Sequence, residues 1–182
     1  INNIFLNLLV LVLIVFIVYV IFKGFSWLII NSIVNRERFK LELNYFLKFG
    51  GLTLIWLLMI LLLFYLVIQS ISEDITVAER TGMQIFFISY LVILFYFAAL
   101  SYAYYVKDEK FWKSLKNAFF SGIKRIYIFV PLFVIIGFVF FVLSLLFSIF
   151  INIPFFFIIP LIVFLVLCIW ARIYLLLVVK EV

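Results

Sequence analysis

Two basic residues, Lys23 and Arg172, lie within or beside long apolar segments and are the first candidates for chemistry. An ionisable side chain is costly inside a bilayer, and where one occurs it commonly marks a substrate or ion site. Arg172 is near the end of its apolar segment, so we expect its guanidinium to reach the membrane surface. Lys23 is a boundary residue if the first span ends at Phe22, the interpretation we favour. If the span continues to Val34, Lys23 is buried and needs a partner.

The other groups that commonly perform catalysis are scarce. The sequence has no histidine and a single cysteine, Cys168, in an apolar run. All eight carboxylates fall in connectors or near segment ends, so no acid lies within a span to relay protons. The sequence also lacks a phosphate-binding glycine loop and a nucleophile elbow. We therefore expect no catalysis by this chain, no metal and no cofactor.

The composition is that of a membrane protein. Apolar residues make up 70% of the chain, charged residues 12%, and the mean hydropathy is +1.45. Soluble domains are about half apolar and a quarter charged. Hydrocarbon offers no hydrogen-bond partner to backbone N–H and C=O groups. Long apolar segments therefore cross a bilayer as helices of about 20 residues, in which these groups pair with one another. The sequence predicts an all-α, polytopic transmembrane helix bundle.

We expect one integral membrane domain over residues 1–182. Five spans are predicted, at residues 4–22 or 4–34, 52–68, 85–106, 126–150 and 154–179. Basic amphipathic helices at residues 36–48 and 108–124 are expected to lie on the membrane surface. Pro160 predicts a bend in the fifth span.

The distribution of lysine and arginine predicts the orientation. Most of the 14 basic residues fall in the first and third connectors, and cytoplasmic loops carry such an excess. This places the chain in a cell membrane with its N-terminus outside and its C-terminus in the cytoplasm. Because topology explains the basic residues, we expect no nucleic-acid partner.

The third connector predicts a surface helix in which apolar residues recur at helical spacing among lysines. Asp108 and Glu109 are expected at its start, where negative charge complements the helix dipole. Such a helix is attracted to anionic lipid headgroups. The basic residues expected to contact these headgroups are Lys110, Lys113, Lys116, Lys124 and Arg125.

Aromatic residues gather near the expected cytoplasmic boundary and predict an interfacial belt, not a ligand cage. They are Tyr102, Tyr104, Tyr105, Trp112, Tyr127, Trp170 and Tyr174.

When the sequence is aligned with itself at an offset of 72 residues, identical residues coincide at two sets of positions. These are Val34, Val106 and Val178, and Glu37, Glu109 and Glu181. An internal repeat of span, charged corner, amphipathic helix and returning span is one interpretation. Chance similarity within a biased composition is the other. If the repeat is genuine, Glu181 opens a third corner and a sixth span belongs to the intact protein.

A span that closes on Val-x-x-Glu and continues into "EKFWKSLKNAFFSGIKRIYIFV" resembles the membrane domain of some glycerophosphodiester phosphodiesterases. It is also similar to related uncharacterised six-span prokaryotic membrane proteins. The resemblance covers residues 13–182 and implies a membrane-embedded companion with no catalytic residue. The soluble phosphodiesterase portion is lacking in this chain.

The leading hypothesis is a non-enzymatic accessory, anchoring or scaffolding subunit that works with membrane lipids, other membrane proteins or further copies of itself. The alternative is a component of a transporter or channel for a small solute or a lipid. Pro160 and Gly137 motivate this alternative, since both residues can interrupt a helix beside a cavity.

Overall fold

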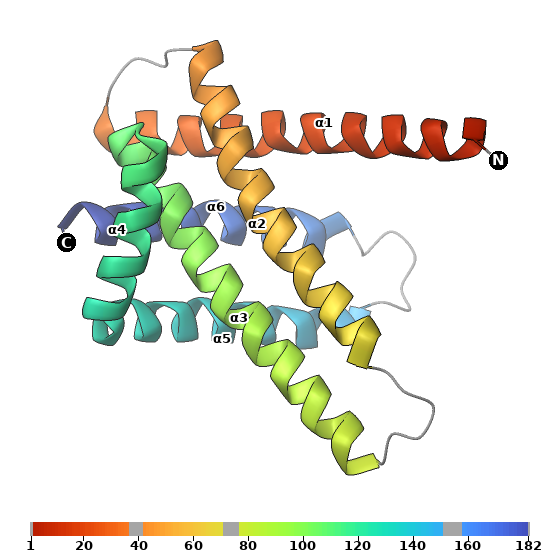
Figure 1. Ribbon diagram of the computed structural model, residues 1–182. Coiled ribbons are helices and arrows are strands. Elements are labelled where there is room, and N and C mark those ends of the chain that lie inside the picture. The colour runs from red at the N-terminus through yellow and green to blue at the C-terminus, as the bar shows by residue number, and fades with distance from the viewer. Residues whose placement is uncertain (1, 37–41, 71–76, 151–157, 182) are drawn as a thin grey trace.

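Almost every described residue belongs to one of six helices (Figure 1). The computed structural model describes residues 2–36, 42–70, 77–150 and 158–181. The helices are α1 (Asn2–Asn35), α2 (Leu43–Ser70), α3 (Val77–Asp108), α4 (Phe111–Lys124), α5 (Ile126–Phe150) and α6 (Ile158–Glu181). The predicted all-α class is confirmed.

Five of the helices are long and apolar enough to cross a membrane, which marks the chain as a multi-pass membrane protein. The candidate spans are Val10–Asn35, Leu43–Gln69, Thr81–Asp108, Ile126–Leu145 and Leu161–Glu181. Helix α1 does not end at Phe22 but continues without a break to Asn35, which agrees with the longer of the two expected first spans. Lys23 therefore lies within the helix, where its side chain is half-buried.

The bend predicted at Pro160 stays a prediction. Pro160 is the third described residue of α6, and residues 151–157 before it lie outside the described part. Helix α5 runs through Pro131 and Gly137 as one element.

The spans form two layers. Helices α1, α6 and α5 lie side by side in that order, and α2 and α3 cross them diagonally (Figure 1). Helix α3 contacts α1, α2, α4 and α6, and is therefore the centre of the bundle. The short helix α4 lies across the end of the bundle where α3 ends, nearly perpendicular to α5 (Figure 1).

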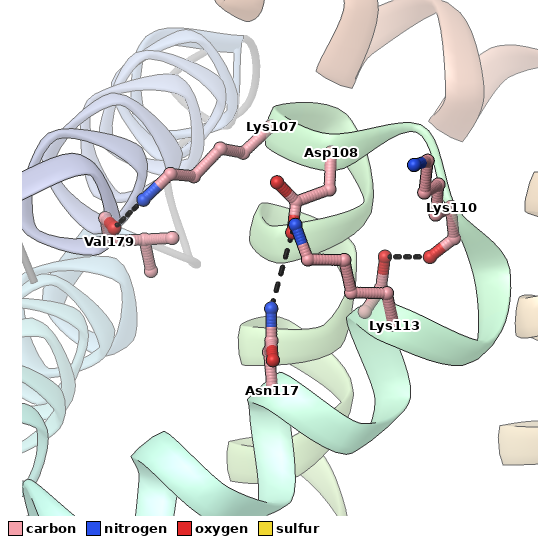
Figure 2. Close-up of polar contacts among 7 residues, drawn as sticks. Lys107, Asp108, Lys110, Lys113, Asn117 and Val179 are labelled. Carbon is pink, nitrogen blue, oxygen red and sulfur yellow. Dashed lines mark hydrogen bonds and ion pairs between the residues drawn. The ribbon is translucent and has the colours of Figure 1, made fainter.

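A tight corner joins α3 to α4 (Figure 2). Glu109 has a φ of 53°, a left-handed conformation that ends α3 and turns the chain. Asp108 was expected at the start of the surface helix, but it is the last residue of α3. Its carboxylate accepts a hydrogen bond from Asn117 at 3.2 Å and pairs with Lys113 at 3.3 Å. Lys107 donates to the Val179 carbonyl at 2.9 Å and thereby joins the corner to α6.

The first corner shares only part of this geometry. Arg36, directly after α1, also has a left-handed φ, of 54°. The surface helix expected at residues 36–48 is not a separate element where it is described. Residues 37–41 lie outside the described part, and residues 43–48 are the first turns of α2. Helix α2 is one element, whereas α4 and α5 are separated at Arg125, so the two corners are followed by different structures.

Helix α4 has two faces. Ser114, Ala118 and Gly122 are buried and face α3, where their small side chains allow close approach. On the outside, Trp112 is 76% exposed, and Phe120 and Ile123 are each 65% exposed. The apolar residues of α4 are thus divided between the bundle and the surroundings. The outer set is suited to the membrane interface.

The expected aromatic belt is only partly correct. Tyr102, Tyr104 and Tyr105 are buried in the bundle instead of lining its boundary, whereas Trp112 and Tyr127 are exposed. The Tyr105 hydroxyl donates to the Tyr45 carbonyl of α2 at 2.9 Å. Tyr105 therefore joins α3 to α2, and Tyr102, whose hydroxyl lies 3.4 Å from that of Thr53, contacts the same helix.

We expect Gly122→Leu to lower the thermal stability of the protein in detergent micelles. A Cβ at Gly122 would lie 3.0 Å from side-chain atoms of both Leu100 and Phe97, so a larger side chain overpacks the α3–α4 contact by about 1–3 kcal/mol. The matched control is Gly137→Leu, because nothing lies within 4 Å of a Cβ there. Equal midpoints of unfolding for the two variants would contradict this packing.

Candidate functional site

A cavity of about 350 Å³ lies between the two layers of the bundle. All five long helices contribute to its wall. Its lining comprises Phe16, Tyr19, Lys23, Trp27, Thr53, Trp56, Leu57, Ile60, Leu94, Phe95, Ala98, Ala99, Tyr102, Phe133, Ile136, Ala171, Arg172 and Leu175. Three of these side chains are also exposed, Tyr19 at 49%, Phe95 at 64% and Leu57 at 36%. All three lie well inside their helices, so the cavity opens between spans and not at an end of the bundle.

Each helix presents one face to the cavity, which follows from helical periodicity. On α1, Tyr19, Lys23 and Trp27 recur every four residues and so share a face. On α3, Ala98 and Tyr102 have the same spacing, and the small Ala98 and Ala99 leave room between the layers.

Lys23 points into this cavity from the middle of its span, about 18 Å from the Asn35 end of α1 at 1.5 Å per residue. It donates a hydrogen bond to the Tyr19 hydroxyl at 2.8 Å. Its ammonium lies 4.0 Å from the centroid of the Tyr102 ring, within cation–π range. Both partners are neutral, so the charge of Lys23 is solvated by the protein but not compensated.

Arg172 does not turn to the membrane surface as expected. Its guanidinium donates a hydrogen bond to the Ser26 hydroxyl and lies 5.8 Å from the centroid of the Trp27 ring. Both contacts are on α1, and Arg172 lines the same cavity as Lys23. The two basic residues singled out from the sequence are therefore brought together by the α1–α6 contact.

Trp27 was not recognised from the sequence, because an aromatic residue in an apolar span has the same signal in any environment. It lines the cavity, is only 3% exposed, and its indole N–H has no hydrogen-bond acceptor among the described residues. A buried polar group without a partner costs about 1–3 kcal/mol. By contrast, the Trp56 indole donates to Ser101 at 2.9 Å.

Two positive charges thus share one apolar cavity, and none of the residues that line it is a carboxylate. A charge at the centre of a span costs about 2.5–3.5 kcal/mol on insertion scales, and like charges repel more strongly at low dielectric. The cation–π contacts offset part of this cost. The arrangement is electrostatically unbalanced.

The polar groups that line the cavity are spread along it. They lie about 9–24 Å along their helices from the ends that meet near α4, with Tyr102 nearest those ends and Tyr19 farthest from them. Apolar side chains line both ends of the cavity, with Leu175 and Phe133 near α4 and Phe16 and Ile60 far from it. The cavity is therefore mostly apolar, with two cationic side chains between apolar ends.

The predicted lipid-contacting residues are in a different place. Lys110 precedes α4, Lys113, Lys116 and Lys124 lie on it, and Arg125 follows it. Lys116 and Lys124 flank a shallow groove with Phe119, Phe120 and Ile123 on the outer side of α4. These basic residues and the cavity are two separate features, and contact with headgroups stays a prediction.

No protein-family model matches the chain, and no curated protein or solved structure matches it. The resemblance to the membrane domain of glycerophosphodiester phosphodiesterases therefore stays a prediction.

We expect Lys23→Met to stabilise the protein by about 1 kcal/mol, because it removes a desolvated, uncompensated charge and keeps an apolar side chain of similar length. Thermal unfolding in detergent measures this. The control is Lys116→Met on the exposed face of α4, which should change stability by no more than about 0.5 kcal/mol. If Lys23→Met instead lowers the stability by about 1 kcal/mol, Lys23 stabilises the fold and this prediction is wrong.

Proposed function

We propose that this chain is a membrane-embedded carrier component that takes a lipid-like molecule into the cavity between its spans. The single observation that carries the proposal is a cavity of about 350 Å³ lined by all five long helices. Ligand pockets of this kind are mostly apolar, with a few polar groups that orient the ligand. The volume lies at the lower end of the usual range for such pockets, about 300–1,000 Å³.

The lateral opening supports a ligand that arrives from the membrane. Phe95 and Tyr19 belong both to the cavity wall and to the outer surface, so acyl chains of the bilayer can reach the opening. A water-soluble solute would meet an entrance bordered by exposed apolar side chains such as Phe95 and Leu57. A lipid-like ligand therefore fits this route better than a polar solute.

An accessory or scaffolding role is the second candidate, and α1 favours it. The stretch Val10–Val15 is exposed, and Figure 1 shows the N-terminal end of α1 extending past the neighbouring ends of α5 and α6. In a membrane this surface is covered by lipid or by a helix of another subunit. A role in assembly does not require a cavity, so the two candidates can be distinguished by whether the cavity takes up ligand.

We expect a photoreactive probe to label the cavity wall. The protein is reconstituted in phosphatidylcholine vesicles with two diazirine-bearing probes of the same long chain, an alcohol and a fatty acid. Peptide mapping by mass spectrometry should show crosslinks on α1, α2 and α3 where they line the cavity. Ala99→Trp fills the cavity and should reduce this labelling several-fold, whereas Val92→Trp, on the exposed face of the same helix, should not.

If neither probe labels the cavity, or if labelling is the same in Ala99→Trp and in the unchanged protein, the carrier proposal is wrong. Purification as a stable complex with another membrane protein would then favour the accessory role.

We further propose that the chain lies in a cell membrane with the α4 end of the bundle in the cytoplasm, because basic residues concentrate at that end. Single cysteines are introduced at Trp112, Lys180 and Gln69 in a Cys168→Ala background. A membrane-impermeant maleimide applied to intact cells should label Gln69→Cys, and should label Trp112→Cys and Lys180→Cys only after lysis. Labelling of Trp112→Cys and Gln69→Cys from the same side contradicts the proposed topology.

A further inference from the structure

We infer that the cavity binds an amphiphile with an anionic headgroup, a carboxylate or a phosphate, held between Lys23 and Arg172 with its apolar chain against the apolar lining. This inference rests on the proposed function and deepens it by naming the class of ligand. It is carried by three observations: the shared cavity of two cations, the hydrogen-bond donors that these cations leave unused, and the apolar lining on both sides of them.

The first observation is the charge balance. Lys23 and Arg172 line one cavity, and the cavity lining contains no carboxylate to neutralise either of them. Their contacts with Tyr19, Tyr102 and Ser26 are with neutral groups. An anion bound in the same cavity would compensate both charges in a medium of low dielectric, where charge-assisted hydrogen bonds are strong.

The second observation is the supply of donors. Trp27 lines the cavity and the centroid of its ring lies 5.8 Å from the Arg172 guanidinium, but its indole N–H is enclosed by protein and is not among the donors that face the cavity. Among the described residues, the Lys23 ammonium makes one hydrogen bond, to Tyr19, and the Arg172 guanidinium makes one, to Ser26. An ammonium has three donors and a guanidinium five, so donors are left for a ligand with several acceptor oxygens.

The third observation is the rest of the lining, which is mostly apolar. Phe16 and Ile60 on one side of the two cations, and Phe133 and Leu175 on the other, offer contacts to an apolar chain. At about 30 Å³ per water-sized group, the cavity accommodates about a dozen such groups. That is an anionic headgroup and the first part of one chain, whose remainder extends through the opening beside Phe95.

The same observations argue against other ligands. A cationic headgroup would be repelled by both basic residues. A neutral lipid would leave the two charges uncompensated, and a small free anion would leave the apolar part of the cavity without contacts. Only a molecule that is anionic at one end and apolar at the other complements the whole lining.

The test compares headgroups on one chain. Diazirine probes with alcohol, carboxylate, phosphate and ammonium headgroups are incorporated at equal mole fraction in phosphatidylcholine vesicles containing the protein. Labelling of cavity peptides should be about tenfold or more stronger for the carboxylate or phosphate probe than for the alcohol, and weakest for the ammonium probe. Labelling of the exposed face of α3 around Val92 serves as the internal reference.

Variants test whether cavity residues cause the stronger labelling by the anionic probes. Lys23→Met and Arg172→Met should each reduce it about tenfold, while Lys23→Arg, which keeps the charge, should retain most of it. The matched control Lys116→Met removes a surface charge outside the cavity and should leave the preference unchanged. Thermal unfolding of each variant shows whether it is folded.

The outcomes separate this inference from the proposed function. Equal labelling of the cavity by the alcohol and both anionic probes overturns the anionic headgroup but leaves the carrier proposal standing. Absence of cavity labelling by every probe overturns both. Displacement of the anionic probe by the same concentration of inorganic phosphate overturns the requirement for an apolar chain. A preference that is lost in Lys116→Met but kept in folded Lys23→Met and Arg172→Met assigns the effect to the surface and also overturns the inference.

Discussion

Hydrocarbon offers no hydrogen-bond partner, so each polar group in a span must find one inside the protein, and this constraint organises the bundle. The ties between spans are hydrogen bonds such as those from Trp56 to Ser101 at 2.9 Å and from Tyr105 to the Tyr45 carbonyl at 2.9 Å. Each contributes little, about 0.6 kcal/mol on average in membrane proteins, but together they fix which helix faces which. Helix α3 supplies partners in both examples and is the element against which the others are placed.

The cavity departs from this rule in the part of the chain that the structure describes. Lys23 and Arg172 have neutral partners only, and the Trp27 indole has none. Elsewhere in the bundle the same types of group are satisfied: Lys113 has Asp108, and the Trp56 indole has Ser101. Here the uncompensated groups gather in one place, although their helices are far apart in the sequence. Such clusters are typical of sites at which a protein loses stability in exchange for binding.

Periodicity and composition were sufficient to predict the class of fold and the positions of most spans, because hydrophobic length is a local property of the sequence. Charge in an apolar context also identified Lys23 and Arg172 as candidates. Their environment could not be predicted, since it depends on the contact of α1 with α6, and no local pattern encodes that contact. Tyr102 and Trp27 were missed for a related reason: an aromatic residue near a span end has the same pattern at an interface, in a core and at a cavity wall.

The pairing of Arg172 with Ser26 joins residues that are 146 positions apart, so the opposite walls of the cavity come from the beginning and the end of the described chain. During synthesis, α1 enters the membrane well before α6 has been made. Until α6 is inserted, Lys23 lies in lipid or beside α2 and α3. Contacts of such long sequence separation form late in folding. The cavity is consequently complete only after α6 has been made, and a chain that stops earlier has neither Arg172 nor the wall that α6 contributes.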